Sequence, residues 1–162
     1  MTGLRIGVGY DVHAFAPGRR LVLGGVEIPH AQGLAGHSDA DVLTHALMDA
    51  ILGAMRAGDI GQHFPDTDER WRDAHSLDLL SKVGEAMRAG GWALVDADCV
   101  LVLEQPKVSA YRDGMREAMA AALGVGPDRV GLKATTTEGL GFTGRGEGAA
   151  AHAVVLLERV SP

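Results

Sequence analysis

"LRIGVGYDVHAF", residues 4–15, alternates apolar positions with small or polar ones, which is the pattern of a β-strand. Side chains of a strand point alternately to its two faces, so Asp11 and His13 lie on the same face near the strand's end. A carboxylate oxygen and an imidazole nitrogen that face one direction supply two ligands of the kind that zinc binds. The rest of the chain must then supply the remaining ligands.

The composition describes a domain with a core of aliphatic side chains. The chain has 162 residues, of which 46% are apolar and only 4% aromatic, and this length is enough for one sizeable core. We therefore expect a single domain over residues 1–162. Cys99 is the only cysteine and lies in an apolar run. It excludes an internal disulfide, indicates a buried and unreactive thiol, and agrees with a reducing cytoplasm.

Charge and hydropathy argue against two classes of partner. The net charge of −6 disfavours non-specific nucleic-acid binding, which depends on clustered Lys and Arg. No apolar run reaches the roughly 18 residues that cross a bilayer, and the N-terminus lacks the basic and apolar regions of a signal peptide. We expect a cytoplasmic protein with no membrane or nucleic-acid partner. A phosphorylated ligand would then need local cations or helix N-termini, because general attraction is absent.

Hydrophobic periodicity and turn residues predict an α+β fold. The predicted strands cover residues 4–15, 20–29, 92–105, 129–137 and 149–160. The predicted helices cover residues 39–57, 76–89 and 109–123, with Ser38, Ser76 and Ser109 as N-caps. Loops are expected over residues 30–38 and 58–71, and a loop as long as the second is usually functional. We expect a mixed β-sheet of the four-stranded type plus a small hairpin, with helices packed on one face.

The first predicted helix supplies a candidate third metal ligand. His45 lies beside its apolar face, four residues from both Asp41 and Asp49. If this helix packs on the sheet, His45 can reach Asp11 and His13, and the set leaves one position open as catalytic zinc sites do. Asp41 or Asp49 could then accept a hydrogen bond from a ligand's second nitrogen. A partly buried histidine without a metal is the alternative.

Two segments are suited to binding phosphate. His37 and Ser38 lie at the predicted start of the first helix, where free backbone N–H groups and the helix dipole attract anions. "KATTTEGLGFTGRGEG", residues 133–148, offers successive hydroxyl and N–H groups, and Glu138 could bind a hard cation. Its spacing is not that of the G-x-x-x-x-G-K-[ST] loop, so a nucleoside triphosphatase is not indicated. A threonine-rich strand end with a tight turn is the alternative.

Five segments together resemble one family. They are "YDVHAF", "AGHSDADVLTHALMDAILGA", "GDIGQHFPDTD", "LEQPK" and "LKATTTEGLGFTGRGEG". In order and spacing they resemble the 2-C-methyl-D-erythritol 2,4-cyclodiphosphate synthases of the non-mevalonate isoprenoid pathway, over residues 4–158. The resemblance implies a lyase that converts 4-diphosphocytidyl-2-C-methyl-D-erythritol 2-phosphate to the 2,4-cyclodiphosphate and CMP. The 2-phosphate of the substrate would attack its β-phosphorus.

The resemblance also implies roles for individual residues. The metal ligands would be Asp11, His13 and His45 for one Zn²⁺ per subunit, and Glu138 for a Mg²⁺ or Mn²⁺ that bridges the diphosphate. The residues that steady the phosphates in the transition state would be His37 and Thr136. Residues 64–68 would form a flexible flap, and cytidine would lie against residues 103–109 and 134–136. The substrate-binding residues would be Ser38, Asp59, Ile60, Gly61, Phe64, Pro65, Asp66, Thr67, Asp68, Leu103, Glu104, Gln105, Pro106, Lys107, Val108, Ser109, Ala134, Thr135, Thr137, Phe142 and Arg145.

The same resemblance implies a homotrimer with active sites between adjacent subunits. Some family members are thought to hold an isoprenoid diphosphate in a central cavity, which Phe142, Arg145 and Glu147 would face. The chain departs from frequent family residues at Ala40, Val108 and Gly139. Gly139 stands where lysine is frequent, so one positive charge near the cavity is missing. A zinc-dependent phosphohydrolase and a non-catalytic isoprenoid- or nucleotide-binding trimer are the alternative functions.

Overall fold

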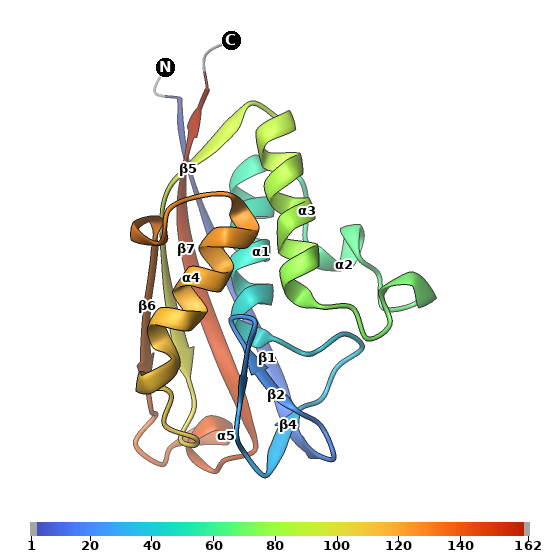
Figure 1. Ribbon diagram of the computed structural model, residues 1–162, viewed down its shortest axis with the longest axis vertical. Coiled ribbons are helices and arrows are strands. Elements are labelled where there is room, and N and C mark those ends of the chain that lie inside the picture. Colours follow the sequence, from blue (N-terminus) through green and yellow to red (C-terminus); the bar gives the residue numbers. More distant parts are fainter. Residues whose placement is uncertain (1–2, 161–162) are drawn as a thin grey trace.

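One mixed β-sheet carries helices on one of its faces in the computed structural model, which describes residues 3–160 (Figure 1). The strands of this sheet lie in the order β4-β1-β7-β5-β6. Their bounds are Leu4–Pro17 for β1, Gln32–Leu34 for β4, Trp92–Val102 for β5, Val130–Thr135 for β6 and Gly148–Arg159 for β7. A separate hairpin consists of β2 (Leu21–Leu23) and β3 (Val26–Ile28).

Three long helices cover the sheet. They are α1 (Val42–Met55), α3 (Ser76–Ala89) and α4 (Arg112–Leu123). The short helices α2 (Ile60–His63) and α5 (Gly141–Gly144) lie in connections, as do the 3₁₀ turns η1 (Glu69–Trp71), η2 (Ser109–Tyr111) and η3 (Pro127–Arg129). Among residues 3–160, no helix is both long and apolar enough to cross a membrane.

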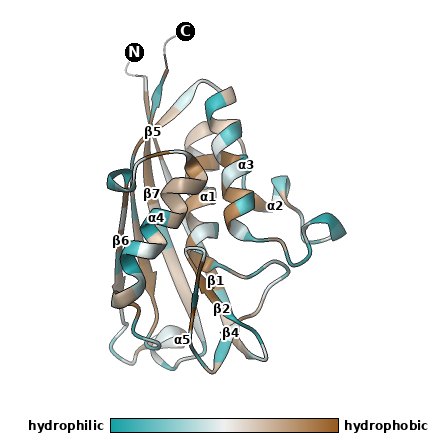
Figure 2. Cartoon of the chain, viewed as in Figure 1, coloured by the Kyte–Doolittle hydropathy of each residue, from teal (hydrophilic) through white to brown (hydrophobic). Residues whose placement is uncertain are grey.

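The pairing of the strands confirms the predicted α+β class. β7 is antiparallel to both β1 and β5, whereas β6 runs parallel to β5. The sheet strands are largely hydrophobic in Figure 2, while α3 and α4 mix hydrophobic and hydrophilic residues. β4 adds a fifth strand to the predicted four, within the expected loop 30–38. It pairs over three residues only, which is too short for a periodic pattern in the sequence.

Two glycines of β1 let α1 lie directly on the sheet. A Cβ at Gly7 would fall 1.9 Å from the carbonyl oxygen of Ala50, and one at Gly9 would fall 1.8 Å from that of Ala46. Any larger residue at these positions would push the helix away. The alternation of the strand places Asp11 on the same face as the glycines. The close approach of α1 therefore brings the helix over the part of β1 that carries Asp11 and His13.

The single strand predicted over residues 20–29 is wrong. The chain reverses at Gly24 and Gly25, whose φ values of 55° and 75° lie in the left-handed region that favours glycine. The carboxylate of Asp41 accepts hydrogen bonds from both backbone N–H groups, at 2.9 Å and 2.7 Å. A side chain distant in sequence thus stabilises the turn that divides the segment into β2 and β3.

The predicted start of the first helix is also wrong. Ala40 has a φ of 56°, which interrupts helical geometry after residue 38, and α1 begins only at Val42. The N-cap is Asp41, which accepts the N–H of Thr44 at 3.0 Å. The buried Asp41 carboxylate therefore satisfies the Thr44 N–H at this helix end, and the anion site expected beside His37 stays a prediction.

The other two serine caps are not formed. His75 holds the N-cap position of α3, and Ser76 is the first helical residue. Ser109 begins the 3₁₀ turn η2, and Tyr111 holds the N-cap position of α4 without a side-chain hydrogen bond. The expected loop 58–71 contains α2 and η1. Residues 1, 2, 161 and 162 of the predicted domain lie outside the described residues, so its full extent stays a prediction.

Candidate metal centre and substrate cavities

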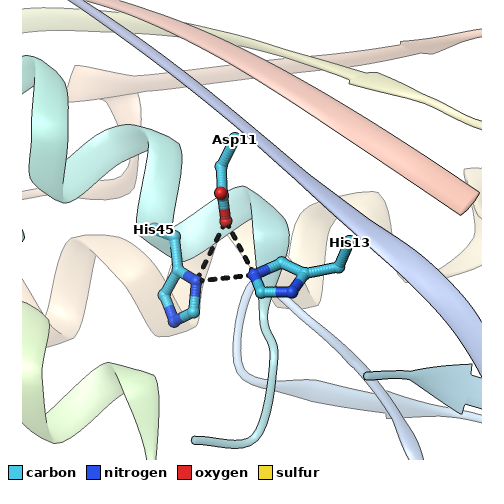
Figure 3. Close-up of side chains that lie close together, drawn as sticks. All are labelled: Asp11, His13 and His45. Atoms are coloured by element: carbon cyan, nitrogen blue, oxygen red, sulfur yellow. Dashed lines mark hydrogen bonds and ion pairs between the residues drawn. The ribbon is translucent and has the colours of Figure 1, made fainter. Parts of the chain in front are cut away.

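Asp11, His13 and His45 meet at one point between β1 and α1 (Figure 3). Oδ2 of Asp11 lies 3.0 Å from Nε2 of His13 and 3.0 Å from Nδ1 of His45. The two imidazole nitrogens lie 3.2 Å apart. The two β1 residues are partly exposed and His45 is buried. The three atoms therefore form a nearly equilateral triangle.

This triangle has the size that a tetrahedral metal ion requires. Ligand bonds of roughly 2.0–2.1 Å place neighbouring ligand atoms about 3.3 Å apart around a tetrahedral zinc. The observed separations of 3.0–3.2 Å need little adjustment to reach that value. Two nitrogens and one carboxylate oxygen leave a fourth position for a substrate atom or water. The donor set can thus hold a divalent metal.

The outer nitrogen of each histidine has a hydrogen-bond partner. Nδ1 of His13 donates to the carbonyl oxygen of Ala35 at 2.7 Å, which leaves Nε2 as the free ligand atom. Nε2 of His45 lies 2.9 Å from Oγ of Ser76 and 3.2 Å from Oγ of Ser38. These contacts orient both rings toward the shared centre.

The prediction that Asp41 or Asp49 contacts a ligand's second nitrogen is wrong. Asp41 is used by the turn of the β2–β3 hairpin and by the start of α1. Asp49 accepts the backbone N–H of Ile60 at 2.9 Å instead. Their spacing of four residues from His45 places them along the helix axis, whereas the ring nitrogen points sideways toward α3.

The electrostatics of the cluster favour a bound cation. Burial raises the pKa of Asp11, but hydrogen bonds and charge attraction from His13 and His45 outweigh it and lower that pKa to about 2. Burial lowers the pKa of His13, but its hydrogen bonds to Asp11 and Ala35 and the Asp11 charge more than compensate, so the pKa lies above its ordinary value. The cluster therefore attracts positive charge, as a proton or as a metal ion.

A cavity of about 430 Å³ opens beside this centre. Its lining includes these residues predicted for the site: Asp11, His13, His37, Ser38, His45, Ile60, Gly61, Phe64 and Asp66. Nε2 of His37 is buried and has no hydrogen-bond partner among residues 3–160. A buried donor or acceptor without a partner is costly, so this nitrogen is available to a ligand in the cavity.

Four predicted neighbours do not line this cavity. They are Asp59, Pro65, Thr67 and Asp68. Asp59 caps α2 by accepting the N–H of Gln62 at 2.9 Å. Asp68 pairs with the guanidinium of Arg70, with its Oδ2 2.6 Å from Nη2. Both carboxylates thus have local partners in the segment between α1 and α3.

A second cavity, of about 390 Å³, lies between β5, β6 and the start of α4. Its lining includes these residues predicted to contact cytidine: Leu103, Pro106, Lys107, Val108, Ser109, Ala134, Thr135 and Thr136. Glu104 and Gln105 do not belong to the lining. One carboxylate oxygen of Glu104 accepts the N–H groups of Thr137 and Gly139, at 3.1 Å and 3.3 Å. Glu104 therefore holds the loop after β6.

The residues predicted for the second metal and the central cavity lie in this loop and just beyond it. Thr136 donates its hydroxyl hydrogen to the exposed Glu138, over 3.3 Å. Phe142 is half-buried, and the exposed Arg145 pairs with Glu147 at 2.9 Å. Within residues 3–160, Thr136 lines the cavity of β5 and β6, and neither it nor Glu138 lines the cavity beside Asp11. Within a single chain, the two residues predicted to be catalytic, His37 and Thr136, therefore line different cavities.

Two residues of the site, Trp71 and Arg19, were not predicted from the sequence. Trp71 lines the cavity beside the metal centre, with its indole Nε1 buried and unpartnered among the described residues. Arg19 donates to the carbonyl oxygens of Gly36 and Ser38, at 3.1 Å and 2.7 Å, and so holds the loop that carries His37. Trp71 lies in the expected loop 58–71, and the length of this loop was the one feature of the sequence that pointed to a functional role. Arg19 gave no signal, because its role depends on chain folding.

The fold and the site together define a class of protein. The chain is an α+β protein with an Asp-His-His centre that can hold a divalent metal beside a cavity of ligand size.

The chain belongs to the YgbB family, whose model matches residues 4–158. A relative from Moorella thermoacetica, named 2-C-methyl-D-erythritol 2,4-cyclodiphosphate synthase, is 58% identical over 154 residues, which are 95% of this chain and 94% of the relative. The bifunctional IspDF of Campylobacter jejuni matches 99% of this chain with a TM-score of 0.95 at 41% identity. This chain covers 44% of that larger protein. The CDP complex of IspF from Plasmodium falciparum matches with a TM-score of 0.87 at 28% identity, over 99% of both chains.

Proposed function

We propose that the protein converts 4-diphosphocytidyl-2-C-methyl-D-erythritol 2-phosphate to 2-C-methyl-D-erythritol 2,4-cyclodiphosphate and CMP. The observation that carries this proposal is the Asp11–His13–His45 triangle, within a chain 58% identical to a relative that bears the synthase name. The reaction is inferred from family membership. The triangle offers the ligands for the divalent metal that this reaction needs. The proposed domain extends over residues 1–162, and the proposed location is the cytoplasm.

Asp11, His13 and His45 would hold Zn²⁺, and Glu138 would hold Mg²⁺ or Mn²⁺. When bound, the two cations would neutralise charge on the phosphate oxygens and align the attacking and leaving oxygens. The exposed Glu138 carboxylate suits a hard cation, because such cations prefer oxygen ligands and retain several waters. The nitrogen-rich triangle suits zinc instead.

The side chains around the metal sites would hold the reacting phosphates. His37 presents a buried nitrogen that has no partner within residues 3–160, and Ser38 belongs to the same cavity lining. Thr136 would place its hydroxyl on the diphosphate from the other cavity. These groups would favour the geometry of the transition state, where the two anionic groups approach each other.

No protein nucleophile or catalytic base is required for this reaction. The attacking group is a phosphate monoester, whose second pKa of about 6 leaves it largely deprotonated near neutral pH. It is tethered to the group that it attacks, and well-oriented intramolecular attack can offset roughly 7–11 kcal/mol of the barrier. The protein's task is therefore to orient the substrate and screen its charge.

The two cavities match the two ends of the substrate. The methylerythritol phosphate would occupy the cavity beside Asp11, with Asp59, Ile60 and Gly61 nearby and residues 64–68 as a flap. The cytidine would occupy the cavity between β5 and β6, where Leu103 and Val108 offer apolar surface and residues 134–136 belong to the lining. The CDP bound by the Plasmodium falciparum relative is the corresponding nucleotide fragment.

A homotrimer would join these two cavities across subunit boundaries. The face of β1 that points away from α1 is apolar and unusually exposed, with Ile6 64% and Val8 67% exposed. Large exposed apolar patches mark interfaces. In such a trimer Phe142 and Arg145 would face the central cavity, where an isoprenoid diphosphate is the proposed ligand. Gly139 would add no positive charge there.

The test of this proposal is a product analysis. The protein, loaded with zinc and supplied with Mg²⁺, should release CMP from the diphosphocytidyl substrate without inorganic phosphate and with formation of the cyclic diphosphate. Inorganic phosphate without a cyclic product would instead establish the phosphohydrolase alternative, in which a metal-bound water attacks. Tight nucleotide binding without any product would establish the non-catalytic alternative.

A further inference from the structure

A chain of hydrogen bonds runs from the start of α3 to the metal-binding histidine. Its members are Asp39, Ser76 and His45. Ser76 is fully buried, and the proposed reaction uses neither it nor Asp39. We infer that Asp39 and Ser76 are positioning residues that keep the hydrogen of the His45 ring on Nε2 and so reserve Nδ1 for the metal. This inference rests on the proposed function only in taking the cluster as a metal centre.

The carboxylate of Asp39 determines the direction of the Ser76 hydroxyl. Its Oδ2 accepts the backbone N–H of Ser76 at 2.9 Å, and its Oδ1 accepts the Ser76 hydroxyl hydrogen. The N–H of Ser76 is among those that α3 leaves without a helical partner, and the helix dipole favours a negative charge there. An ionised carboxylate has no hydrogen to give. The single hydrogen of the Ser76 hydroxyl therefore points toward Asp39.

The Ser76 oxygen can then only accept a hydrogen bond from His45. Its Oγ lies 2.9 Å from Nε2 of His45, so the hydrogen of the neutral imidazole must be on Nε2. In the metal-loaded centre the lone pair of Nδ1 would then point to the site that it shares with Oδ2 of Asp11, 3.0 Å away. In the metal-free cluster a proton takes the place of the metal between these atoms. If the hydrogen were on Nδ1 instead, it would occupy the position where a metal ion binds.

Ser38 is the competing partner of the same nitrogen. Its Oγ lies 3.2 Å from Nε2 of His45 and accepts the N–H of Ala40 at 3.3 Å. Its own hydrogen is not committed to a carboxylate, so Ser38 could donate to His45 and favour the wrong ring form. The contact of Nε2 with the fully buried Ser76 is shorter, so Ser76 and not Ser38 determines which ring nitrogen carries the hydrogen. The Ser38 hydroxyl hydrogen is thereby left for a substrate oxygen.

Ser76→Ala is the direct test, with zinc affinity as the first readout. Zinc affinity is measured by competition with a chromophoric chelator. Loss of the outer partner of a metal-bound histidine typically weakens metal binding by about 10- to 100-fold, and we expect a loss in this range for Ser76→Ala. Asp39→Asn, which leaves Ser76 in place but removes its fixed acceptor, should also weaken binding. Ser81→Ala, on the same helix, is the control and should bind zinc as the wild type does.

The second readout is the His45 Nε2–H proton in the NMR spectrum of the zinc-loaded protein. In the wild type and in Ser38→Ala this proton should be protected from exchange and resonate downfield. In Ser76→Ala the signal should be lost or exchange rapidly. Variants that bind zinc as tightly as the wild type, or that melt earlier but keep the protected Nε2–H signal, would overturn the inference.

The two proposals fail in different ways. A wild-type protein that binds zinc tightly but forms no cyclic product would refute the proposed function and leave the role of Ser76 intact. Unchanged zinc affinity in both Ser76→Ala and Asp39→Asn would refute the role of Ser76 and leave the proposed function intact. If Ser76→Ala does not fold, Asp39→Asn alone carries the test, because it retains the buried hydroxyl.

Discussion

At the scale of single residues, the metal centre depends on which atoms carry hydrogen. His13 is held by a backbone carbonyl and His45 by a buried serine, and both ligand nitrogens face Asp11. Strand alternation predicted the pair of Asp11 and His13, because residues two apart share a face. The outer partners were not predictable, because Ala35 and Ser76 reach the rings only after the chain has folded.

Zinc affinity should fall as the pH is lowered through neutrality. The pKa of His13 lies above its ordinary value in the metal-free cluster, so a proton occupies the ring below that pKa and must leave when zinc binds. Affinity is therefore greatest above the raised pKa and decreases below it. Calorimetry in buffers of different ionisation enthalpy should detect proton release on binding. Affinity that is constant from about pH 8 to pH 6, with no proton release, would contradict this account of the centre.

Cys99 should not react with thiol reagents in the native protein. Burial raises the pKa of its thiol to about 12, and its side chain is fully buried. At pH values well below 12 the thiolate is scarce, and the reagent has no access. A chromogenic disulfide at neutral pH should label the unfolded protein and leave the native protein unlabelled. Rapid stoichiometric labelling without unfolding would show that β5 opens in solution.

At the scale of elements, the spacing between α1 and β1 is the critical dimension. Gly7 and Gly9 permit the contact, and His45 reaches the β1 ligands only because the helix lies so close. In the sequence, these glycines stand only as small residues of an alternating strand. Their role requires knowing which helix packs on that face, which the local pattern does not contain.

Gly9→Ala should weaken both folding and zinc binding. The new methyl group would lie 1.8 Å from the carbonyl oxygen of Ala46, so α1 must move, at a cost of about 1–3 kcal/mol in the free energy of unfolding. Urea denaturation and zinc content measure the two effects. Gly53→Ala in α1 is the matched control, because its methyl group meets nothing closer than 3.9 Å and should preserve or increase stability by up to about 1 kcal/mol. Equal stability and zinc content in both variants would refute the packing argument.

The boundaries of elements show where local patterns are insufficient. Strands β1, β5, β6 and β7 and helix α3 lie where periodicity predicted them, with ends that differ by a few residues at most. Residues 20–29 form a hairpin because Asp41 binds the turn, and α1 starts late because Ala40 adopts a positive φ. Both errors come from tertiary contacts that override local propensity.

At the scale of the whole molecule, one chain carries two cavities that each contain some of the predicted site residues. The exposed apolar face of β1 offers a surface on which copies of the chain could assemble. The predictions of a trimer and of active sites shared between subunits came from the resemblance to a family. The residue patterns alone supported an α+β domain with a candidate three-ligand metal site, because assembly depends on surfaces that only folding creates.

Val8→Glu should prevent assembly while leaving the metal centre intact. Val8 is 67% exposed on the β1 face that points away from α1, and surface changes of this kind usually alter stability by less than about 0.5 kcal/mol. Sedimentation should show a trimer for the wild type and a smaller species for the variant. The variant should bind zinc but lose cyclising activity. A wild-type monomer with full activity would contradict the shared-site proposal.

The central claim is that Asp11, His13 and His45 bind one metal ion together. Anomalous diffraction at the zinc edge, from crystals of the zinc-loaded protein, tests it most directly. The account predicts a single strong peak within about 2.0–2.2 Å of Asp11 Oδ2, His13 Nε2 and His45 Nδ1. A peak at any other group of side chains, or no peak between these three atoms at saturating zinc, would contradict it.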